Sequence, residues 1–294
     1  MTVAMVLAAG YGTRLRPLTD ERPKALVPLG DRPVIAHQIE RIREQLGEVP
    51  ILVNTHHLAN DLSSFVANYD HSVRIVEERE IRGTAGGLHA ALEVLHDEPL
   101  FVVNSDVISD ANYRDLLGIV AHNDIVLRIV PQPIGHGPVG VDERGCVARL
   151  RNESFGTEVS GGDYLGVAAI GAGAAQRLPA KGCLVADFML PWLRTGSRIR
   201  AHVEACSWVD LGTPREYFRA NMDWLRRRSM DSWLAPGTQV ESTVELKSSI
   251  LGEGSRVVGQ GYLHRVIAWP GAAVRAPLDN AIVSSRGVIV RVGD

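Results

Sequence analysis

The stretch LAAGYGTRLRPLTDERPKALVPLGDRPV, residues 7–34, decides which fold the chain adopts. Residues 3–7 at its start are apolar or small and predict a buried first strand. The glycine-rich turn at residues 10–13 lets backbone N–H groups converge, because no bulky side chain stands in the way. Arg14 follows at once, and Lys24 comes ten residues later. Converging amides beside two permanent cations predict a polyphosphate-binding loop at the end of a strand.

Two commoner glycine loops do not match this stretch. A dinucleotide-binding loop needs a third glycine with a helix directly behind it. In this chain that third position is Leu15, and Pro17 disfavours an immediate helix. A P-loop ends in Gly-Lys-Ser/Thr, a tripeptide that does not occur in the sequence. The remaining alternative is a tight strand-to-loop turn with surface cations.

Composition limits the class of protein. A chain of 294 residues can bury a large core and form one or two domains. Its formal charge of −3 gives no global attraction to nucleic acid or to acidic membranes, so we expect neither partner and only local phosphate recognition. Cys146, Cys183 and Cys206 lack metal-like spacing and are expected to be buried core thiols. No signal peptide or membrane span is visible in the sequence, which predicts a cytoplasmic protein.

Residues 1–228 alternate β-rich runs with amphipathic helical patterns and are expected to form one domain. Strands are expected at residues 3–8, 51–54, 73–77, 100–104 and 125–130. Apolar residues recur at helical spacing in residues 35–46 and 88–95. Strand, helix, strand with short connections predicts an α/β fold with a doubly wound, mostly parallel sheet. Such sheets bind ligands at the carboxyl ends of their strands.

Later segments add to this domain. Residues 139–141, 146–150 and 164–170 are β-rich and predict an insertion of antiparallel strands that would wall a second substrate. Helices are expected around residues 172–178 and 185–193. Residues 213–216, Thr-Pro-Arg-Glu, predict the start of the last helix of the domain. They supply a capping hydroxyl, a proline at the first helical position and a glutamate three residues after the cap.

Beyond residue 229 a 17-residue repeat replaces the helical periodicity. Its members are Pro236-Gly237-x-x-Val240, Glu253-Gly254-x-x-Val257 and Pro270-Gly271-x-x-Val274. Left-handed parallel β-helices use about 18 residues per coil, so residues 234–294 predict a short, left-handed β-helix-like domain. A stack of about three coils cannot bury itself well, so it is expected to lean on the first domain or on another subunit of a homo-oligomer. The alternative is an irregular β-rich tail.

Two aspartates complete the chemical pattern. Asp106 follows the apolar strand at residues 100–104, and Asp210 precedes a tight glycine turn. Read alone, the first suits a helix cap and the second a turn residue. Together, in a fold that carries a polyphosphate loop, they predict a shared site for Mg²⁺, which prefers oxygen ligands and takes only one or two from protein.

Four segments resemble the sugar-1-phosphate nucleotidyltransferases, also called nucleotide-sugar pyrophosphorylases. They are residues 7–35, GTAGGLHAA at 83–91, NSD at 104–106 and WVDLGTPREY at 208–217, in the order that the family uses. The resemblance covers residues 1–228 and, more weakly, the tail, which is similar to that of the mannose-1-phosphate guanylyltransferase type. It implies transfer of a nucleotidyl group from a nucleoside triphosphate to a sugar 1-phosphate, with release of pyrophosphate.

The resemblance also implies a role for each charged residue. Arg14 would neutralise the β- and γ-phosphates over the Gly10 loop, and Lys24 would balance charge where the two anions meet. Asp106 and Asp210 would hold the Mg²⁺ that bridges the α-phosphate and the incoming sugar phosphate. A sugar phosphate is already a nucleophile at neutral pH, so no general base is needed and catalysis is positioning plus electrostatics.

The expected nucleotide-binding residues are Leu7, Ala8, Ala9, Gly10, Gly12, Thr13, Glu78, Gly83 and Thr84. The Glu78 carboxylate can accept hydrogen bonds from N1–H and the N2 amine of guanine, which favours GTP. Short uridylyltransferases for amino sugars also carry a glutamate near this position, and Glu78 can equally be read as a solvated strand-end residue. Uridylyl or thymidylyl transfer to another hexose or amino-sugar 1-phosphate therefore stays open.

The expected sugar-phosphate residues are Gly140, Arg151, Glu153 and Gly166. Many relatives carry a Glu-Lys pair where this chain has Arg151 and Asn152. Arg151 would supply the missing cation, although a guanidinium fork is not equivalent to an ammonium. This departure leaves room for a non-catalytic regulator that binds nucleotide sugars. A glycosyltransferase, the third alternative, usually holds its metal with Asp-x-Asp, which Asn104-Ser105-Asp106 does not match.

Overall fold

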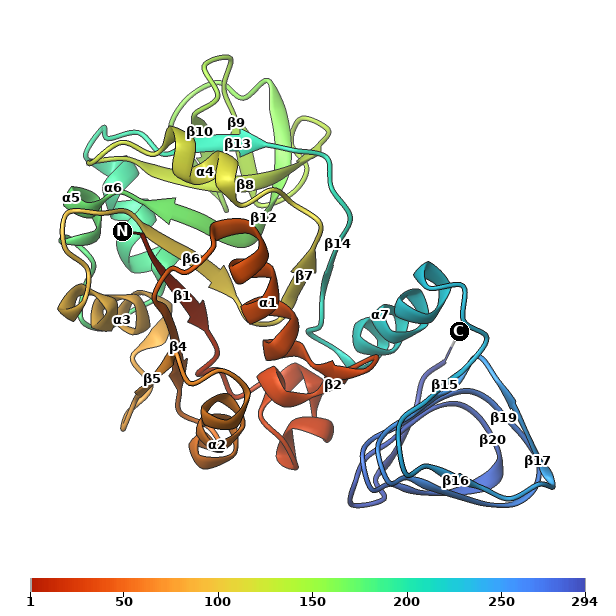
Figure 1. Cartoon of the computed structure of the whole chain (residues 1–294). Coiled ribbons are helices and arrows are strands. Elements are labelled where there is room, and N and C mark those ends of the chain that lie inside the picture. Colours follow the sequence, from red (N-terminus) through yellow and green to blue (C-terminus); the bar gives the residue numbers. More distant parts are fainter. Residues whose placement is uncertain (1, 294) are drawn as a thin grey trace. The chain divides into compact units, whose positions relative to one another are not determined.

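The computed structural model describes residues 2–293 (Figure 1). The chain groups into two compact units. Unit 1 contains the chain up to Gly10 and Gln38–Trp208, and unit 2 contains Tyr11–His37 and Val209 onward. The phosphate-loop segment after Gly10 thus groups with the tail, whereas the sequence places a domain boundary near residue 228. That boundary stays a prediction about domain organisation. Within residues 2–293, no helix has the length and apolar character needed to cross a membrane.

The parallel half of the large sheet in unit 1 confirms the predicted strands. Its strands are β6 (Leu100–Asn104), β1 (Val3–Leu7), β4 (Ile51–Thr55) and β5 (Val73–Glu77), in that spatial order. The first three are almost wholly buried, as expected for apolar strands covered on both faces. The segments between the strands contain α1 (Val34–Leu46), α2 (Ala59–Tyr69), α3 (Gly83–His89) and the 3₁₀ turn η4 (Ala90–Glu93).

The other half of this sheet is antiparallel. The long strand β12 (Ser160–Ile170) runs against β6, β8 (Ile125–Gln132) and β9 (Val139–Val141). Strands β10 (Val147–Leu150) and β11 (Glu153–Ser154) extend it, and β13 (Arg200–Val203) pairs in parallel with β8. The predicted antiparallel insertion is therefore confirmed. Because β12 reverses direction beside β6, the sheet as a whole is mixed.

Short elements complete unit 1. They are β7 (Val107–Ser109), α4 (Arg114–Ile119), α5 (Ala172–Ala175), the π-helical turn η5 (Leu184–Met189) and α6 (Leu190–Arg194). The prediction of buried core thiols is wrong, since Cys146, Cys183 and Cys206 are all partly exposed. Their positions give the reason: each lies in a connection next to a strand or helix rather than inside one.

Helix α7 (Pro214–Arg227) holds the parts of unit 2 together. The Thr213 hydroxyl accepts a hydrogen bond from the Glu216 amide, which confirms the predicted helix start. One turn on, the Tyr217 hydroxyl donates to the Pro28 carbonyl at 2.6 Å and accepts from the buried Trp269 indole at 3.0 Å. The N-terminal part of the unit has the 3₁₀ turns η1 (Thr13–Leu15), η2 (Leu18–Asp20) and η3 (Lys24–Leu26), and strands β2 (Pro28–Leu29) and β3 (Arg32–Pro33).

The tail forms a stack of parallel coils (Figure 1). Its strands are β15 (Trp233–Leu234), β16 (Gln239–Val240), β17 (Val244–Lys247), β18 (Ile250–Leu251), β19 (Arg256–Ala268), β20 (Ala273–Val283) and β21 (Ile289–Arg291). Gln239 pairs with Arg256, and Arg256 pairs with Ala273, which confirms the 17-residue repeat. After Gly259 the offset shortens, so His264 pairs with Asp279, and β21 runs antiparallel to β20. The left-handed sense of the coils stays a prediction.

Candidate active site

The phosphate-loop segment begins in unit 1 and continues in unit 2. In unit 1, the Ala8 amide after β1 donates to the Asn54 side-chain oxygen at 2.7 Å. In unit 2, Gly12 takes a left-handed conformation (φ 62°) and begins η1, and its carbonyl accepts from the Leu15 amide and the Thr19 hydroxyl. The turns after Gly12 are 3₁₀ rather than α-helical, which agrees with the exclusion of a dinucleotide-binding loop.

Two cations converge on Asp210 within unit 2. The Arg14 guanidinium donates to Asp210 Oδ2 at 3.4 Å, and Lys24 Nζ lies 3.6 Å from Oδ1. The Lys24 side chain is only 12% exposed, whereas that of Arg14 is 65% exposed. Asp210 Oδ1 is buried and accepts no hydrogen bond from any described residue. The cluster therefore carries one excess positive charge, which suits it to a phosphate group.

Gly212 leaves the space that Arg14 occupies. A Cβ at this position would lie 2.9 Å from the carbon and both terminal nitrogens of the guanidinium. The WVDLGT segment, with β14 (Trp208–Asp210) at its start, thus supplies both the carboxylate and the open backbone against which Arg14 lies.

Asp106 lies in unit 1, in the turn from β6 to β7, and is partly buried. The buried Gln38 side chain donates to the carbonyls of Asn104 and Val107 on either side of it. The Ser105 amide donates to the Leu7 carbonyl of the neighbouring strand at 3.0 Å. Sequence reasoning missed Gln38, because an amide on the buried face of α1 carries no motif of its own.

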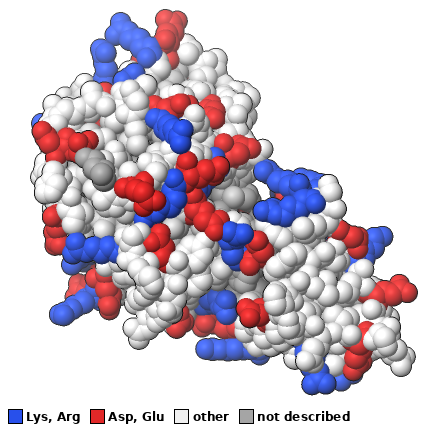
Figure 2. Space-filling view, in the orientation of Figure 1, with Lys and Arg blue, Asp and Glu red and all other residues white. Residues whose placement is uncertain are grey.

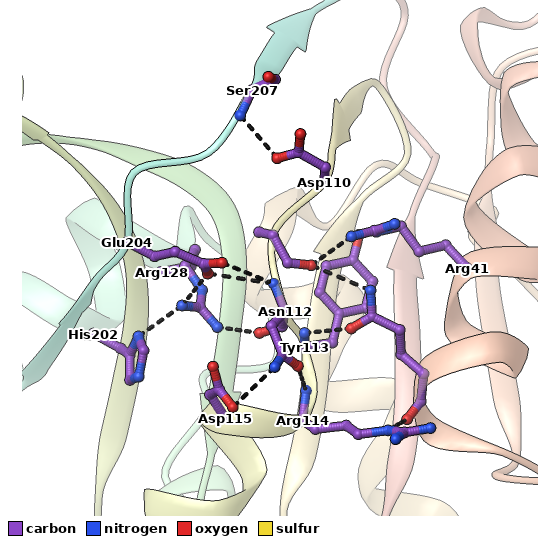
Figure 3. Close-up of polar contacts among 12 residues, drawn as sticks. Arg41, Asp110, Asn112, Tyr113, Arg114, Asp115, Arg128, His202, Glu204 and Ser207 are labelled. Atoms are coloured by element: carbon purple, nitrogen blue, oxygen red, sulfur yellow. Dashed lines mark hydrogen bonds and ion pairs between the residues drawn. The ribbon is translucent and has the colours of Figure 1, made fainter.

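Two hydrogen bonds, one of them drawn in Figure 3, fasten the segment after Asp106 to the segment that leads to Trp208. The Asp110 amide donates to the Ser207 carbonyl at 3.1 Å, and the Ser207 amide donates to Asp110 Oδ1 at 2.8 Å. Asp110, four residues after the end of the NSD motif, therefore lies beside Ser207, the residue that precedes the WVDLG motif.

An ion pair between a buried arginine and a half-buried glutamate supports this contact (Figure 3). The Arg128 side chain on β8 is fully buried, pairs with Glu204 and donates to the Asn112 carbonyl and to His202 Nδ1. Burial lowers the pKa of His202 below 6.5, and the positive charge of Arg128 lowers this pKa further. Burial likewise lowers the pKa of Arg128, although Glu204 opposes this. The segment between β13 and β14 is thus held by charge as well as by backbone hydrogen bonds.

On the predicted base side, Glu78 is 2% exposed, so the reading of it as a solvated strand-end residue is wrong. Its Oε1 accepts from Asn54 Nδ2 at 2.7 Å, and its Oε2 accepts from the Arg82 amide at 2.8 Å. The Thr84 hydroxyl, at the start of α3, accepts from the Leu184 amide at 2.7 Å. The direct contact of Glu78 with guanine stays a prediction. Sequence reasoning missed Asn54, whose only signal is its place at the end of the second strand.

The predicted sugar-side residues are spread over several local contacts. Glu153 is held by two hydrogen bonds from Arg194, and these lower the pKa of its carboxyl. The exposed Arg151 guanidinium lies 3.7 Å from the Cys183 sulfur. A Cβ at Gly140 would collide with the Glu158 carboxylate, and one at Gly166 with the Asn104 amide. Of these four predicted residues, only Gly166 packs against a residue of the NSD motif, Asn104. Arg151 contacts Cys183, and Glu153 accepts hydrogen bonds from Arg194.

The donor types fit a hard divalent cation. Asp106 and Asp210 offer carboxylate oxygens, and Asp210 Oδ1, which faces Lys24 but accepts no hydrogen bond, has acceptor capacity left for a cation. Within residues 2–293, no group of three or more His, Cys, Asp and Glu side chains could hold a metal ion. Figure 2 shows that both acidic and basic side chains are spread over the visible face.

Comparisons with known proteins identify the family of the chain. Residues 3–227 match the family described as "Nucleotidyl transferase". The chain is 31% identical over 270 residues to probable mannose-1-phosphate guanylyltransferase 3 of Oryza sativa subsp. japonica, covering 85% of this chain and 73% of that protein. It is 30% identical to mannose-1-phosphate guanylyltransferase 1 of Arabidopsis thaliana, with the same coverage.

A solved structure shows the same fold. The structure of HddC from Yersinia pseudotuberculosis, complexed with GMP-PN, matches with a TM-score of 0.64. The match is 21% identical and covers 76% of this chain and all of that one.

Proposed function

This chain belongs to the nucleotidyl transferase family and is a sugar-1-phosphate nucleotidyltransferase, and we propose that it transfers a guanylyl group from GTP to mannose 1-phosphate. Transferases of this family generally use a divalent metal, and we propose Mg²⁺. The observation that carries the proposal is the Arg14–Asp210–Lys24 cluster directly behind the glycine loop. The guanylyl and mannose assignments rest on the relatives, which are mannose-1-phosphate guanylyltransferases by name.

The protein's own residues act on charge and position. The loop that contains Leu7, Ala8, Ala9, Gly10, Gly12 and Thr13 would take the triphosphate on its backbone amides. Arg14 then neutralises the β- and γ-phosphates, and the less exposed Lys24 lies where the α-phosphate and the sugar phosphate meet. Asp210 pairs with both cations before substrate arrives and reduces their mutual repulsion, so they are held ready for the phosphates.

Asp106 and Asp210 would hold Mg²⁺, because their oxygens are the ligands that this ion prefers. When bound, the ion neutralises charge that develops on the transferring phosphoryl group. The phosphate of the sugar attacks the α-phosphorus in line, the bond to the β-phosphate oxygen breaks, and pyrophosphate leaves. Since a phosphate monoester is already nucleophilic, the protein supplies no general base.

The remaining predicted residues are assigned either to the base side of the nucleotide or to the sugar phosphate. Gly83 and Thr84 begin α3 and are proposed, together with Glu78, for the base side of the nucleotide site. Gly140, Arg151, Glu153 and Gly166 are proposed for the sugar phosphate. We also propose that the protein works in the cytoplasm as a homo-oligomer. Light scattering of the purified protein gives the mass of the assembly and tests the oligomeric state.

Pyrophosphate release tests the function directly. The purified protein with Mg²⁺ is given GTP, UTP, dTTP, CTP or ATP against a panel of sugar 1-phosphates. The proposal expects release that depends on GTP and mannose 1-phosphate, and its loss in Asp106→Asn and Asp210→Asn proteins that keep their circular dichroism. Turnover with another pair would overturn the substrates alone. The absence of pyrophosphate release from a folded protein that still binds a nucleotide sugar would instead support the non-catalytic regulator. The observation that favours the regulator is Arg151, which stands where many relatives carry a Glu-Lys pair and contacts the Cys183 sulfur.

A further inference from the structure

We propose that Asn54 and Glu78 form a positioning bridge that aligns the loops around the nucleotide, and that Glu78 acts through this bridge rather than by touching the base. The inference rests on the proposed function, because it concerns the same triphosphate site. It assigns Asn54, a residue without a motif, to that site.

The bridge joins the ends of three neighbouring strands. Asn54 is 3% exposed and lies near the end of β4, which pairs in parallel with β1 on one side and β5 on the other. Its oxygen accepts from the Ala8 amide, the first amide after β1, at 2.7 Å. Its nitrogen donates to Glu78, the first residue after β5, also at 2.7 Å. The second Glu78 oxygen accepts from the Arg82 amide at 2.8 Å, immediately before Gly83.

The identity of each side chain follows from its partners. Glu78 faces two donors, Asn54 Nδ2–H and the Arg82 amide, so both of its oxygens must accept. A glutamine at position 78 would turn an NH₂ group toward one of these donors. Asn54 faces a donor on one side and a carboxylate on the other, so only an amide satisfies both. An aspartate at position 54 would place two carboxylates in contact.

Helix α3 closes over the bridge. A Cβ at Gly87 would lie 2.5 Å from Asn54 Nδ2 and 3.0 Å from Glu78 Oε1, so the helix backbone packs directly on both side chains. The carboxylate is thereby buried beneath the helix that starts at Gly83. A change in the bridge is therefore transmitted to the phosphate loop at Ala8 and to the helix start together.

The donor pattern supplies a stringent test. In the double variant Asn54→Asp/Glu78→Gln, the aspartate accepts from Ala8 and from the glutamine NH₂, and the glutamine oxygen accepts from Arg82. All three hydrogen bonds and the single negative charge are kept, although both residues have changed. Each single variant breaks the pattern. Glu77→Gln is the matched control, because Glu77 is the adjacent carboxylate and is exposed.

Two measurements are made on the wild type, both single variants, the double variant and Glu77→Gln. Amide hydrogen exchange is followed in peptides that contain Ala8 and Arg82. Initial rates are measured with GTP, with UTP and with ITP, which lacks the N2 amine of guanine. We expect about tenfold faster exchange and about tenfold higher KM for every triphosphate in each single variant, the size of one lost buried hydrogen bond. The double variant and Glu77→Gln should match the wild type.

The outcomes separate the bridge from the function. An altered GTP-to-ITP preference in Glu78→Gln that the double variant does not restore would overturn the bridge and favour direct reading of guanine. Unchanged exchange at both amides in the single variants would also overturn it. If a single variant does not fold, the double variant decides, because the bridge requires it to fold with wild-type exchange. A wild type that is inactive with every substrate overturns the proposed function, while the exchange measurement still tests the bridge.

Discussion

Replacing Gly212 by alanine should move Arg14 without unfolding the protein. The new Cβ would lie 2.9 Å from the guanidinium, whereas carbon atoms in contact keep about 3.5–4.0 Å. Arg14 must therefore shift by about 0.6 Å or more, and displacement of a positioning group by about 1 Å can cost a factor of about 100 in rate. Arg14 is mostly exposed, so its pair with Asp210 contributes only about 1 kcal/mol or less to stability.

We expect kcat/KM for pyrophosphate release to fall about 10- to 100-fold in Gly212→Ala, while Tm changes by less than about 4 °C. Arg14→Ala should lose about as much activity, and the double variant no more than the worse single one, since both act through one guanidinium. Gly118→Ala serves as the control, because a Cβ there meets no described atom within 4 Å outside its own helix turn and chain neighbours. Full activity in Gly212→Ala together with a strong loss in Arg14→Ala would refute the placement of the guanidinium against the Gly212 backbone.

Three further predictions concern stability. Arg128→Met should lower the free energy of unfolding in urea by about 3 kcal/mol, because it leaves Glu204 half-buried without its cation; a loss below about 1 kcal/mol would contradict this. Because the pKa of His202 is lowered in the folded state, the unfolded state binds the extra proton first, so stability should fall as pH drops below 6.5. This component of the Tm-against-pH curve should vanish in His202→Gln, and an identical curve would count against it. Thr213→Ala should cost about 1 kcal/mol of unfolding free energy through the lost helix cap, with Thr213→Ser as the variant that keeps it.

Most of the fold could be predicted from local patterns in the sequence. Strands β4, β5 and β6 were predictable because their apolar runs end at polar residues, and β1 because its apolar run ends at the glycine turn. Helix α7 was predictable because Thr213 and Pro214 mark its start. The antiparallel pairing of β12 with β6 was harder to predict, because an apolar run does not indicate which strand it pairs with or in which direction. The grouping of residues 11–37 with the tail depends on long-range contacts such as Tyr217 to Pro28, which no local pattern reveals.

The candidate site could likewise be predicted only in part from the sequence. Arg14, Lys24 and Asp210 could be named from motif spacing, and the structure brings these three together. Glu78 was named for its side chain's capacity to accept hydrogen bonds, yet its burial and its partner Asn54 follow from strand order. Gln38 and Arg128 could not be found, because a polar residue in an apolar element looks like a surface residue until its neighbours are known.

The pairing of the coils limits how the tail can vary in length. Since neighbouring strands are offset by 17 residues, a whole added or deleted coil keeps every inward valine inward. A single-residue insertion within a strand would turn the following side chains to the opposite face. The tail can therefore change in length only by whole coils, and a longer tail with the same strand pairing should be longer by a multiple of one coil. The shortened last coil and the antiparallel β21 act as a terminator, so such growth is confined to the turns before them.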